Sequence, residues 1–341
     1  MTTTTHTVAS STPSEPASPP ATSWTRAGLG ELLLEIAISG QAPEASRTAE
    51  ISAARETLTT ALSPEDWYAA MTPALCARRP QPMLQWLLDV GVLGALLPEL
   101  EATVALSQEG GRRHKDVWEH TKTVVWQAVP RPEVRWAALL HDIGKVPTRK
   151  FLPNGKVTFH GHAEVGRRMF RKGPARTIGF PSEVKARVEF LILHHLRPGQ
   201  YAPTWTDAAV RRFAREMGEG LTDLLDLGRA DVTSRRPGKR KSCLRQISAL
   251  SVRIRELAAE DAVPRPLPSG LGSVLMRSLE LPPGKHLAAL RQRLEGLCLA
   301  GELEHHREPE YYVEAVRRLA LLDGVEIHVA RRGRASDTPA I

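Results

Sequence analysis

Apolar residues recur at helical spacing along most of the chain, and the alternation typical of strands occurs in short stretches. Residues three or four apart share one face of a helix, so this pattern predicts amphipathic helices that pack on one another. Outside the central third, the expected helices are 25–39, 47–62, 64–72, 82–97, 241–260, 271–279, 284–300 and 309–323. Short extended segments are expected at 155–159 and 325–329. The predicted fold class is therefore all-α.

In the central third, residues that can bind metal lie where the pattern predicts buried helix faces. His120 extends a stripe formed by Val117 and Val124, and Asp231 extends a stripe that includes Leu224. The residues that follow or extend apolar runs in this way are His120, His141, Asp142, His162, His195 and Asp231. Polar groups inside a protein are normally paired or bound to a cation, so this set needs an explanation.

Two explanations are open at this point. A single histidine on an apolar stripe is usually a core histidine with a satisfied ring, and Asp142 can pair with Lys145 at the end of a helix. Several helices that each place a His or Asp inward instead favour a metal centre, because helical bundles build such centres from facing side chains. Imidazole with carboxylate suits Mn, Fe, Co, Ni or Zn better than an ion that prefers oxygen ligands alone. The expected cofactor is one or two divalent ions, either a transition metal or Mg, and the spacing does not distinguish among them.

Composition favours a cytoplasmic protein without a membrane anchor. The cysteines, Cys76, Cys243 and Cys298, are scattered without paired spacing, which is typical of a reducing compartment. The longest apolar runs are far shorter than a membrane span. Residues 1–24 are rich in Thr, Ser and Pro, and they predict a disordered leader rather than a signal or transit peptide.

The formal net charge is +8, and part of the positive charge is clustered. The cluster that follows Asp231 comprises Arg235, Arg236, Lys239, Arg240 and Lys241. Contacts from Lys and Arg to phosphates drive sequence-independent binding of nucleic acids, so this cluster is a candidate phosphate-binding surface. The alternative is a solvated helix face. Because few aromatic residues accompany the basic ones, stacking platforms for single strands are not expected.

The order His120, His141-Asp142, Asp231 resembles the four-point signature of the HD superfamily of metal-dependent phosphohydrolases. The resemblance implies that these four residues hold a first ion. It also implies that intervening histidines hold a second ion or the substrate phosphate, namely His162 and His195, with His194 as a lesser candidate.

Catalytic roles follow from the same resemblance for residues beside the ligands. Asp142 would bridge the ions, Lys145 would neutralise charge that builds up on the phosphoryl oxygens, and His160 would steer the leaving group. The implied reaction is hydrolysis of a phosphate ester in a nucleotide, a 2′,3′-cyclic phosphate or an RNA end.

A second resemblance covers roughly residues 80–320. Segments 113–121, 141–149, 159–164 and 193–198 resemble the HD-containing carboxyl-terminal half of bacterial tRNA CCA-adding enzymes and poly(A) polymerases. Segments 79–80, 84–93 and 97–100 resemble the neck of those enzymes, and segments 270–272 and 281–285 resemble their tail. The implied organisation is a disordered leader (1–24), a helical neck-like region (25–109), an HD domain (110–235), a helical tail resembling the RNA-binding tail of CCA-adding enzymes (236–325) and a flexible basic end (326–341).

One feature of those transferases is not found in the sequence. Their amino-terminal head carries a Gly-Ser turn and two aspartates one residue apart, and residues 1–80 contain no such pair. Nucleotide addition is therefore not expected, which leaves three function classes. These are a metal-dependent phosphohydrolase with a nucleotide or RNA substrate, a tRNA- or RNA-binding module with an idle or structural metal, and an accessory subunit of a split tRNA nucleotidyltransferase.

Overall fold

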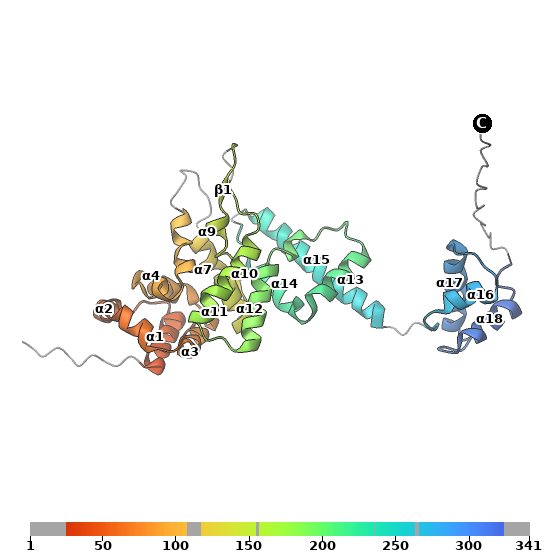
Figure 1. Ribbon diagram of the computed structural model, residues 1–341, viewed down its shortest axis with the longest axis horizontal. Coiled ribbons are helices and arrows are strands. Elements are labelled where there is room, and N and C mark those ends of the chain that lie inside the picture. Colours follow the sequence, from red (N-terminus) through yellow and green to blue (C-terminus); the bar gives the residue numbers. More distant parts are fainter. Residues whose placement is uncertain (1–24, 108–116, 155–156, 235, 263–265, 324–341) are drawn as a thin grey trace, which may run out of the picture. The chain divides into compact units, whose positions relative to one another are not determined.

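The computed structural model describes residues 25–107, 117–154, 157–234, 236–262 and 266–323. They belong to two compact units, one ending at Arg255 and the other beginning at Glu256. The described residues are helical apart from one pair of two-residue strands and the connecting turns, so the all-α prediction is confirmed (Figure 1). None of the described helices is both long and apolar enough to cross a membrane. The predicted leader, the segment 325–329 and the basic end lie outside the described residues.

The first unit begins with α1 (Arg26–Ser39), α2 (Ala45–Ala61), α3 (Pro64–Cys76), α4 (Pro80–Asp89), α5 (Val92–Leu96) and α6 (Pro98–Glu101), followed by the 3-10 turn η1 (Val104–Ser107). Local sequence explains where these helices start. The Thr25 hydroxyl caps α1, and Ser63 with Asp66 forms a capping box at the start of α3. Proline occupies the first position of α3, α4 and α6, where the missing N–H costs no hydrogen bond.

The predicted helix 82–97 is two helices, and it starts two residues earlier than expected. The first helix of this stretch already starts at Pro80 and stops at Asp89, and the next begins at Val92. Between them Gly91 has a φ of +76°, a left-handed conformation that glycine adopts without steric cost. The surrounding residues are apolar on both sides of the break, so hydrophobic periodicity alone does not reveal it.

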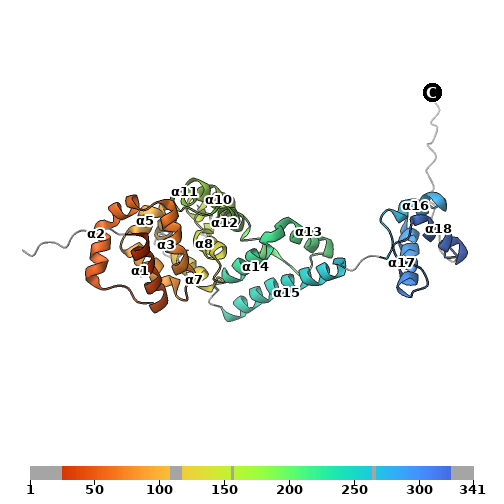
Figure 2. The ribbon, with the colours of Figure 1, turned by 90° about the horizontal axis from the view of Figure 1, so that it is seen from below.

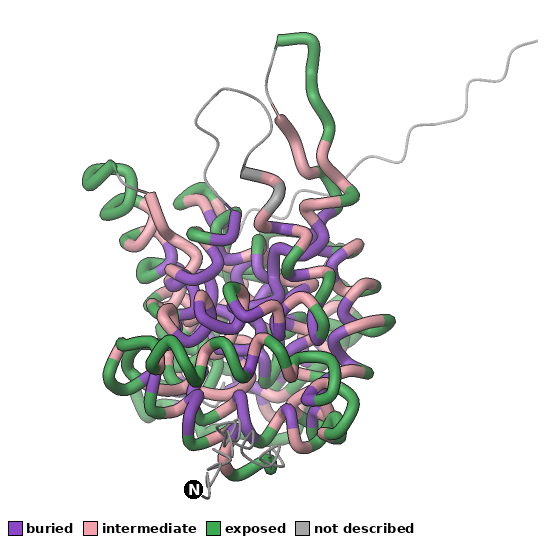
Figure 3. Tube along the Cα trace, turned by 90° about the vertical axis from the view of Figure 1, so that its left-hand side faces the viewer, coloured by how far each residue is buried: buried purple, intermediate pink, exposed green. Residues whose placement is uncertain are grey.

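The middle of the first unit is built around α8 (Pro132–Leu140). Every residue of this helix from Val134 to Leu140 is buried, and α8 packs against α3, α7 (Val117–Gln127), α12 (Ser182–His194) and α14 (Leu221–Ala230). Buried positions gather in this interior (Figure 3). A helix that is apolar all round must be covered on all sides, so α8 delivers the residues that follow it into the core.

The other elements of this unit are α9 (Lys145–Thr148), β1 (Lys150–Phe151), β2 (Val157–Thr158), α10 (His162–Lys172), α11 (Pro174–Thr177), η2 (Pro198–Gln200), α13 (Asp207–Met217), η3 (Gly218–Gly220) and most of α15 (Pro237–Ala262). The strands pair antiparallel, which partly confirms the extended segment expected at 155–159. Helix α15 lies beside α13 and α14 (Figure 2), and the Arg253 guanidinium pairs with Asp207 at the start of α13.

The second unit contains α16 (Leu271–Ser278), α17 (Lys285–Leu299) and α18 (Pro309–Arg318). Its own core includes the buried side chains of Leu275, Leu294 and Tyr312. The first two helices agree with the predictions 271–279 and 284–300 to within a residue. The predicted helix 309–323 is too long, because the described helix ends at Arg318 and Ala320 adopts a positive φ.

Candidate metal centre

The candidate ligands converge from five helices, mostly at helix ends rather than within helices. His141 and Asp142 directly follow α8, His195 directly follows α12, and Asp231 directly follows α14. His162 is the first residue of α10, and His120 lies within α7. The expectation that each residue lies on a helical stretch therefore needs correction for those that follow a helix. A residue at a helix end can turn its side chain towards a point where several helices meet.

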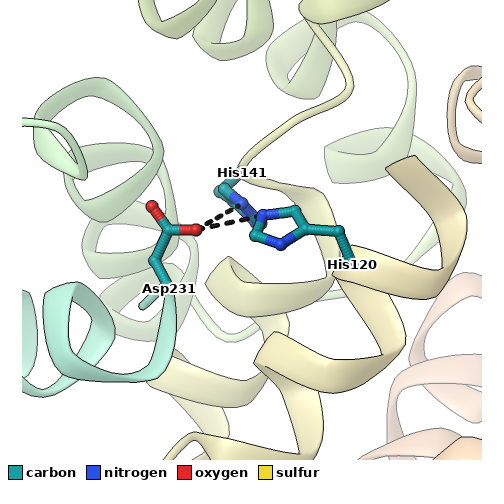
Figure 4. Close-up of side chains that lie close together, drawn as sticks. All are labelled: His120, His141 and Asp231. Atoms are coloured by element: carbon teal, nitrogen blue, oxygen red, sulfur yellow. Dashed lines mark ion pairs between the residues drawn. The ribbon is translucent and has the colours of Figure 1, made fainter. Parts of the chain in front are cut away.

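His120, His141 and Asp231 form the first group (Figure 4). The Oδ1 atom of Asp231 lies 3.0 Å from His120 Nε2 and 3.7 Å from His141 Nε2. Asp142 Oδ2 lies 3.4 Å from His120 Nε2 and 3.2 Å from His141 Nε2. Two imidazole nitrogens and two carboxylate oxygens thus face one point.

Asp142, His162 and His195 form the second group. Asp142 Oδ1, the oxygen that does not face the first group, lies 3.6 Å from His162 Nε2. The Nε2 atoms of His162 and His195 are 3.1 Å apart. Asp142 therefore presents one oxygen to each group. Lys145 Nζ, which bonds Asp142 Oδ2 at 2.5 Å, is a cation beside this shared carboxylate.

Backbone carbonyls hold three of the rings by their other nitrogen. The Nδ1 atom of His141 lies 2.8 Å from the Ala138 carbonyl oxygen. The Nδ1 atom of His162 lies 2.9 Å from the Phe159 carbonyl oxygen, and that of His195 lies 2.8 Å from the Ile192 carbonyl oxygen. A carbonyl oxygen only accepts, so each Nδ1 carries the hydrogen. When the rings are neutral, their Nε2 lone pairs are directed at the centre of the site, which is the tautomer a metal requires.

Two buried atoms in this cluster make no hydrogen bond of good geometry among the described residues, namely Asp142 Oδ1 and His141 Nε2, although His141 Nε2 lies 3.2 Å from Asp142 Oδ2. An unpaired buried polar atom is costly, and native proteins rarely retain one without a reason. The Nε2 lone pairs of neutral His162 and His195 would also face each other at 3.1 Å. A divalent cation would satisfy all four atoms, so the residues present fit a metal.

The pKa shifts of the site residues show that the site favours positive charge. Burial opposes a charged ring at His141, but Asp142 and Asp231 outweigh it and raise the pKa of His141 to about 10. Burial alone would raise the pKa of each carboxyl, yet the neighbouring histidines hold both well below their usual range. Burial and the charge of His141 lower the pKa of His195 to about 4. Both carboxylates are thus ionised and ready to bind a cation.

The remaining candidates lie outside both groups. His160 is exposed, and the half-buried His194 packs its ring against Phe190 with centroids 4.7 Å apart. The structure thus brings His195, rather than His194, into the second ligand group. A steering role for His160 stays a prediction.

The basic cluster is largely exposed at the start of α15. Arg236, Lys239 and Lys241 lie on the surface, and Arg235 is outside the described residues. Arg240 has a structural contact as well, because its Nη2 donates to Gln127 Oε1 at 2.7 Å. Gln127 in turn donates to the carbonyl of Ala230 at 2.8 Å, beside Asp231. Phosphate binding by this cluster stays a prediction.

Sequence reasoning missed two residues that shape the site. Thr233 Oγ1 lies 2.8 Å from His120 Nδ1 and so orients that ring. Gly144 lets α10 approach the His141-Asp142 turn, because a Cβ there would lie 2.1 Å from the carbonyl oxygen of His162. The glycine beside His141-Asp142 was a usable signal for close backbone contact, whereas nothing near Thr233 in the sequence points to His120.

Replacing Thr233 with Val is expected to weaken metal binding by about ten- to a hundredfold while leaving the fold intact, because partners of ligating histidines fix ring orientation. Titration with a competing chelator measures the affinity. Thr123→Val is the matched control, since the Thr123 hydroxyl donates to the Glu119 carbonyl of its own helix at 2.8 Å. Equal metal affinity of the Thr233→Val variant and the unmodified protein would contradict this role.

The chain is similar to a known domain family and to several known proteins. Residues 117–236 match the family described as HD domain. The CC-adding tRNA nucleotidyltransferase of Thermus thermophilus is 37% identical over 216 residues, which cover 61% of this chain and 47% of that protein. The A-adding tRNA nucleotidyltransferase of Deinococcus radiodurans is 34% identical over 234 residues, covering 66% and 52%, respectively. The Multifunctional CCA protein of Pseudomonas fluorescens is 38% identical over 92 residues, covering 26% and 22%.

The chain thus spans about half the length of the first two relatives. The ligand order, the convergence of the side chains and the family match agree on one assignment: residues 117–236 form an HD domain, within a chain that is homologous to tRNA nucleotidyltransferases over about 60% of its length.

Proposed function

We propose that the protein is a metal-dependent phosphohydrolase that acts on a nucleotide, a 2′,3′-cyclic phosphate or the phosphate at an RNA end. The observation that carries the proposal is the meeting of both ligand groups at Asp142, whose two oxygens face different sets of imidazole nitrogens. Such an arrangement holds one or two ions beside a lysine, and phosphate esters are the substrates that metal ions and lysine together serve best.

The residues of the chain divide the work as follows. His120, His141, Asp142 and Asp231 would hold a first ion, and His162 and His195 would complete a second, in the order that the HD domain match supports. A bound divalent ion would supply Lewis-acid polarisation of the phosphoryl oxygen and would lower the pKa of bound water to ~7. Lys145 is partly exposed, so its ammonium group can neutralise charge on the phosphoryl oxygens, and the exposed His160 would steer the leaving group.

Metal removal tests this function directly. The chelator-stripped protein is expected to be inactive on a panel of phosphate esters, and reloading with Mn, Ni, Co, Fe or Zn should restore turnover. Elemental analysis before stripping and after reloading ties activity to bound metal. A stripped protein that turns over substrate as fast as the reloaded one would exclude the proposal.

The homology favours a second candidate, an RNA-binding module with an idle metal site. The relatives are named as tRNA nucleotidyltransferases, and their similarity covers about 60% of this chain. Binding of tRNA that weakens steeply with salt, without metal-dependent turnover of any phosphate ester, would favour this candidate.

A further inference from the structure

The antiparallel pair β1–β2 exposes apolar side chains, and along the chain it lies between Asp142 and His162 of the candidate metal centre. The Phe151 side chain is 59% exposed and that of Leu152 is 39% exposed. This hairpin projects from the helices near α9 (Figure 1), and Figure 3 shows β1 as an exposed segment. A two-stranded hairpin has no core of its own, and neighbouring exposed apolar side chains mark interaction sites more often than scattered single ones do.

Cations accompany the aromatic rings of this hairpin. The Arg149 guanidinium carbon lies 5.2 Å from the centroid of the Phe151 ring, and Lys145 Nζ lies 5.7 Å from the centroid of Phe159. Lys150, which lies between Arg149 and Phe151 in the sequence, is also exposed. Residues 143–163 contain four Lys or Arg and no Asp or Glu, so the charge of this segment complements an anionic partner.

Both strands lead into residues of the metal centre. Before β1, Lys145 bonds Asp142 Oδ2 at 2.5 Å. After β2, the Phe159 carbonyl accepts a hydrogen bond from His162 Nδ1 at 2.9 Å. The register pairs Phe151 with Val157, which puts these side chains on the same face of the ribbon. The aromatic surface is therefore continuous along the chain with the groups that would hold a phosphate.

We propose that Phe151, backed by Arg149, is a stacking platform for a base of single-stranded RNA whose phosphate end reaches the metal centre. The inference rests on the proposed function and specifies its substrate as base-bearing rather than a small phosphate ester. Rings flanked by cations suit nucleic acid, because the ring or guanidinium stacks on the base while the positive charge meets the backbone. This platform departs from the sequence-based expectation that stacking platforms are absent, since the hairpin brings aromatic rings and cations together.

The test is equilibrium binding of the full-length, metal-loaded protein to two RNA probes. One is an oligoadenylate about six nucleotides long with a hydrolysis-resistant phosphorothioate end, and the other has the same backbone with abasic riboses. Phe151→Ala is expected to raise the Kd for the base-bearing probe by about tenfold and to leave the Kd for the abasic probe unchanged. Phe151→Trp should retain binding, whereas Phe151→Leu, which is apolar without a π-face, should bind like the Ala variant.

Ile38→Ala is the control for loss of an exposed apolar side chain, because Ile38 is 60% exposed on α1. Unchanged binding of the base-bearing probe by Phe151→Ala, or an equal loss for both probes, overturns the proposal. Metal-dependent turnover of a panel of phosphate esters, with and without a base, is measured in parallel. If turnover of this panel is intact in all variants while the probes do not discriminate, the platform fails and the phosphohydrolase function stands. If the unmodified protein turns over no member of the panel, the phosphohydrolase function itself fails.

Discussion

The Asp142→Ala variant is expected to lose metal-dependent phosphohydrolase activity by about three orders of magnitude, because the change removes the carboxylate that both ligand groups share. Its Oδ2 atom lies 3.2 Å from His141 Nε2, and its Oδ1 atom lies 3.6 Å from His162 Nε2. Loss of this side chain should also lower the amount of metal that copurifies. Initial rates on a phosphate ester and elemental analysis of the same samples measure both effects.

Two further variants distinguish the effect of the Asp142 charge from that of its shape and from a general loss of folding. Asp142→Asn keeps the shape but not the charge, and it is expected to be almost as inactive as the Ala variant. Asp89→Asn is the control, since Asp89 is an exposed carboxylate on α4 that accepts a hydrogen bond from Gln85 at 2.8 Å. Circular dichroism should give the same helical signal for all variants. Full activity of Asp142→Ala would remove the mechanism.

Gly144→Ala is expected to destabilise the protein by about 3 kcal/mol and to lower activity by about a hundredfold, although it adds one methyl group. The new Cβ would lie 2.1 Å from the His162 carbonyl oxygen and 2.6 Å from the Gly166 amide nitrogen. Both atoms belong to the backbone of α10, so the whole helix must move away. The movement would carry His162 away from Asp142 and disrupt the second ligand group, while His120, His141 and Asp231 keep their positions.

Thermal or urea unfolding measures the change in stability, and metal titration follows the loss of the second group. Gly199→Ala is the matched control, because a Cβ at Gly199 meets no atom within 4 Å. Wild-type stability and wild-type metal binding in Gly144→Ala would show that α10 does not approach this turn as closely as described.

Most helices could be predicted from the sequence, because their local signals agree with their packing. The capping box of Ser63 and Asp66 and the prolines at helix starts act within one turn of the chain. The break at Gly91 was missed because apolar residues on both sides continue the pattern, and only the left-handed conformation of the glycine ends the helix. The predicted helix 64–72 stops before Pro73, but α3 continues through this proline to Cys76.

The convergence of the ligands was also predictable, because apolar stripes orient residues even before their neighbours are known. His162 is buried while His160 is exposed, a difference that a two-residue offset around a turn produces. The partners of the rings were not predictable. Backbone carbonyls such as that of Ala138 leave no mark in the side-chain pattern, and Thr233 meets His120 only through tertiary packing.

Asp231 is the last of the six ligands along the chain, and it follows a helix that packs on both α7 and α8. A protein is synthesised from its amino terminus, so the four candidate histidines and Asp142 leave the ribosome before α14 does. Until residue 231 has emerged, the set of candidate donors is incomplete. The metal site proposed above would therefore be completed only after translation has passed residue 231.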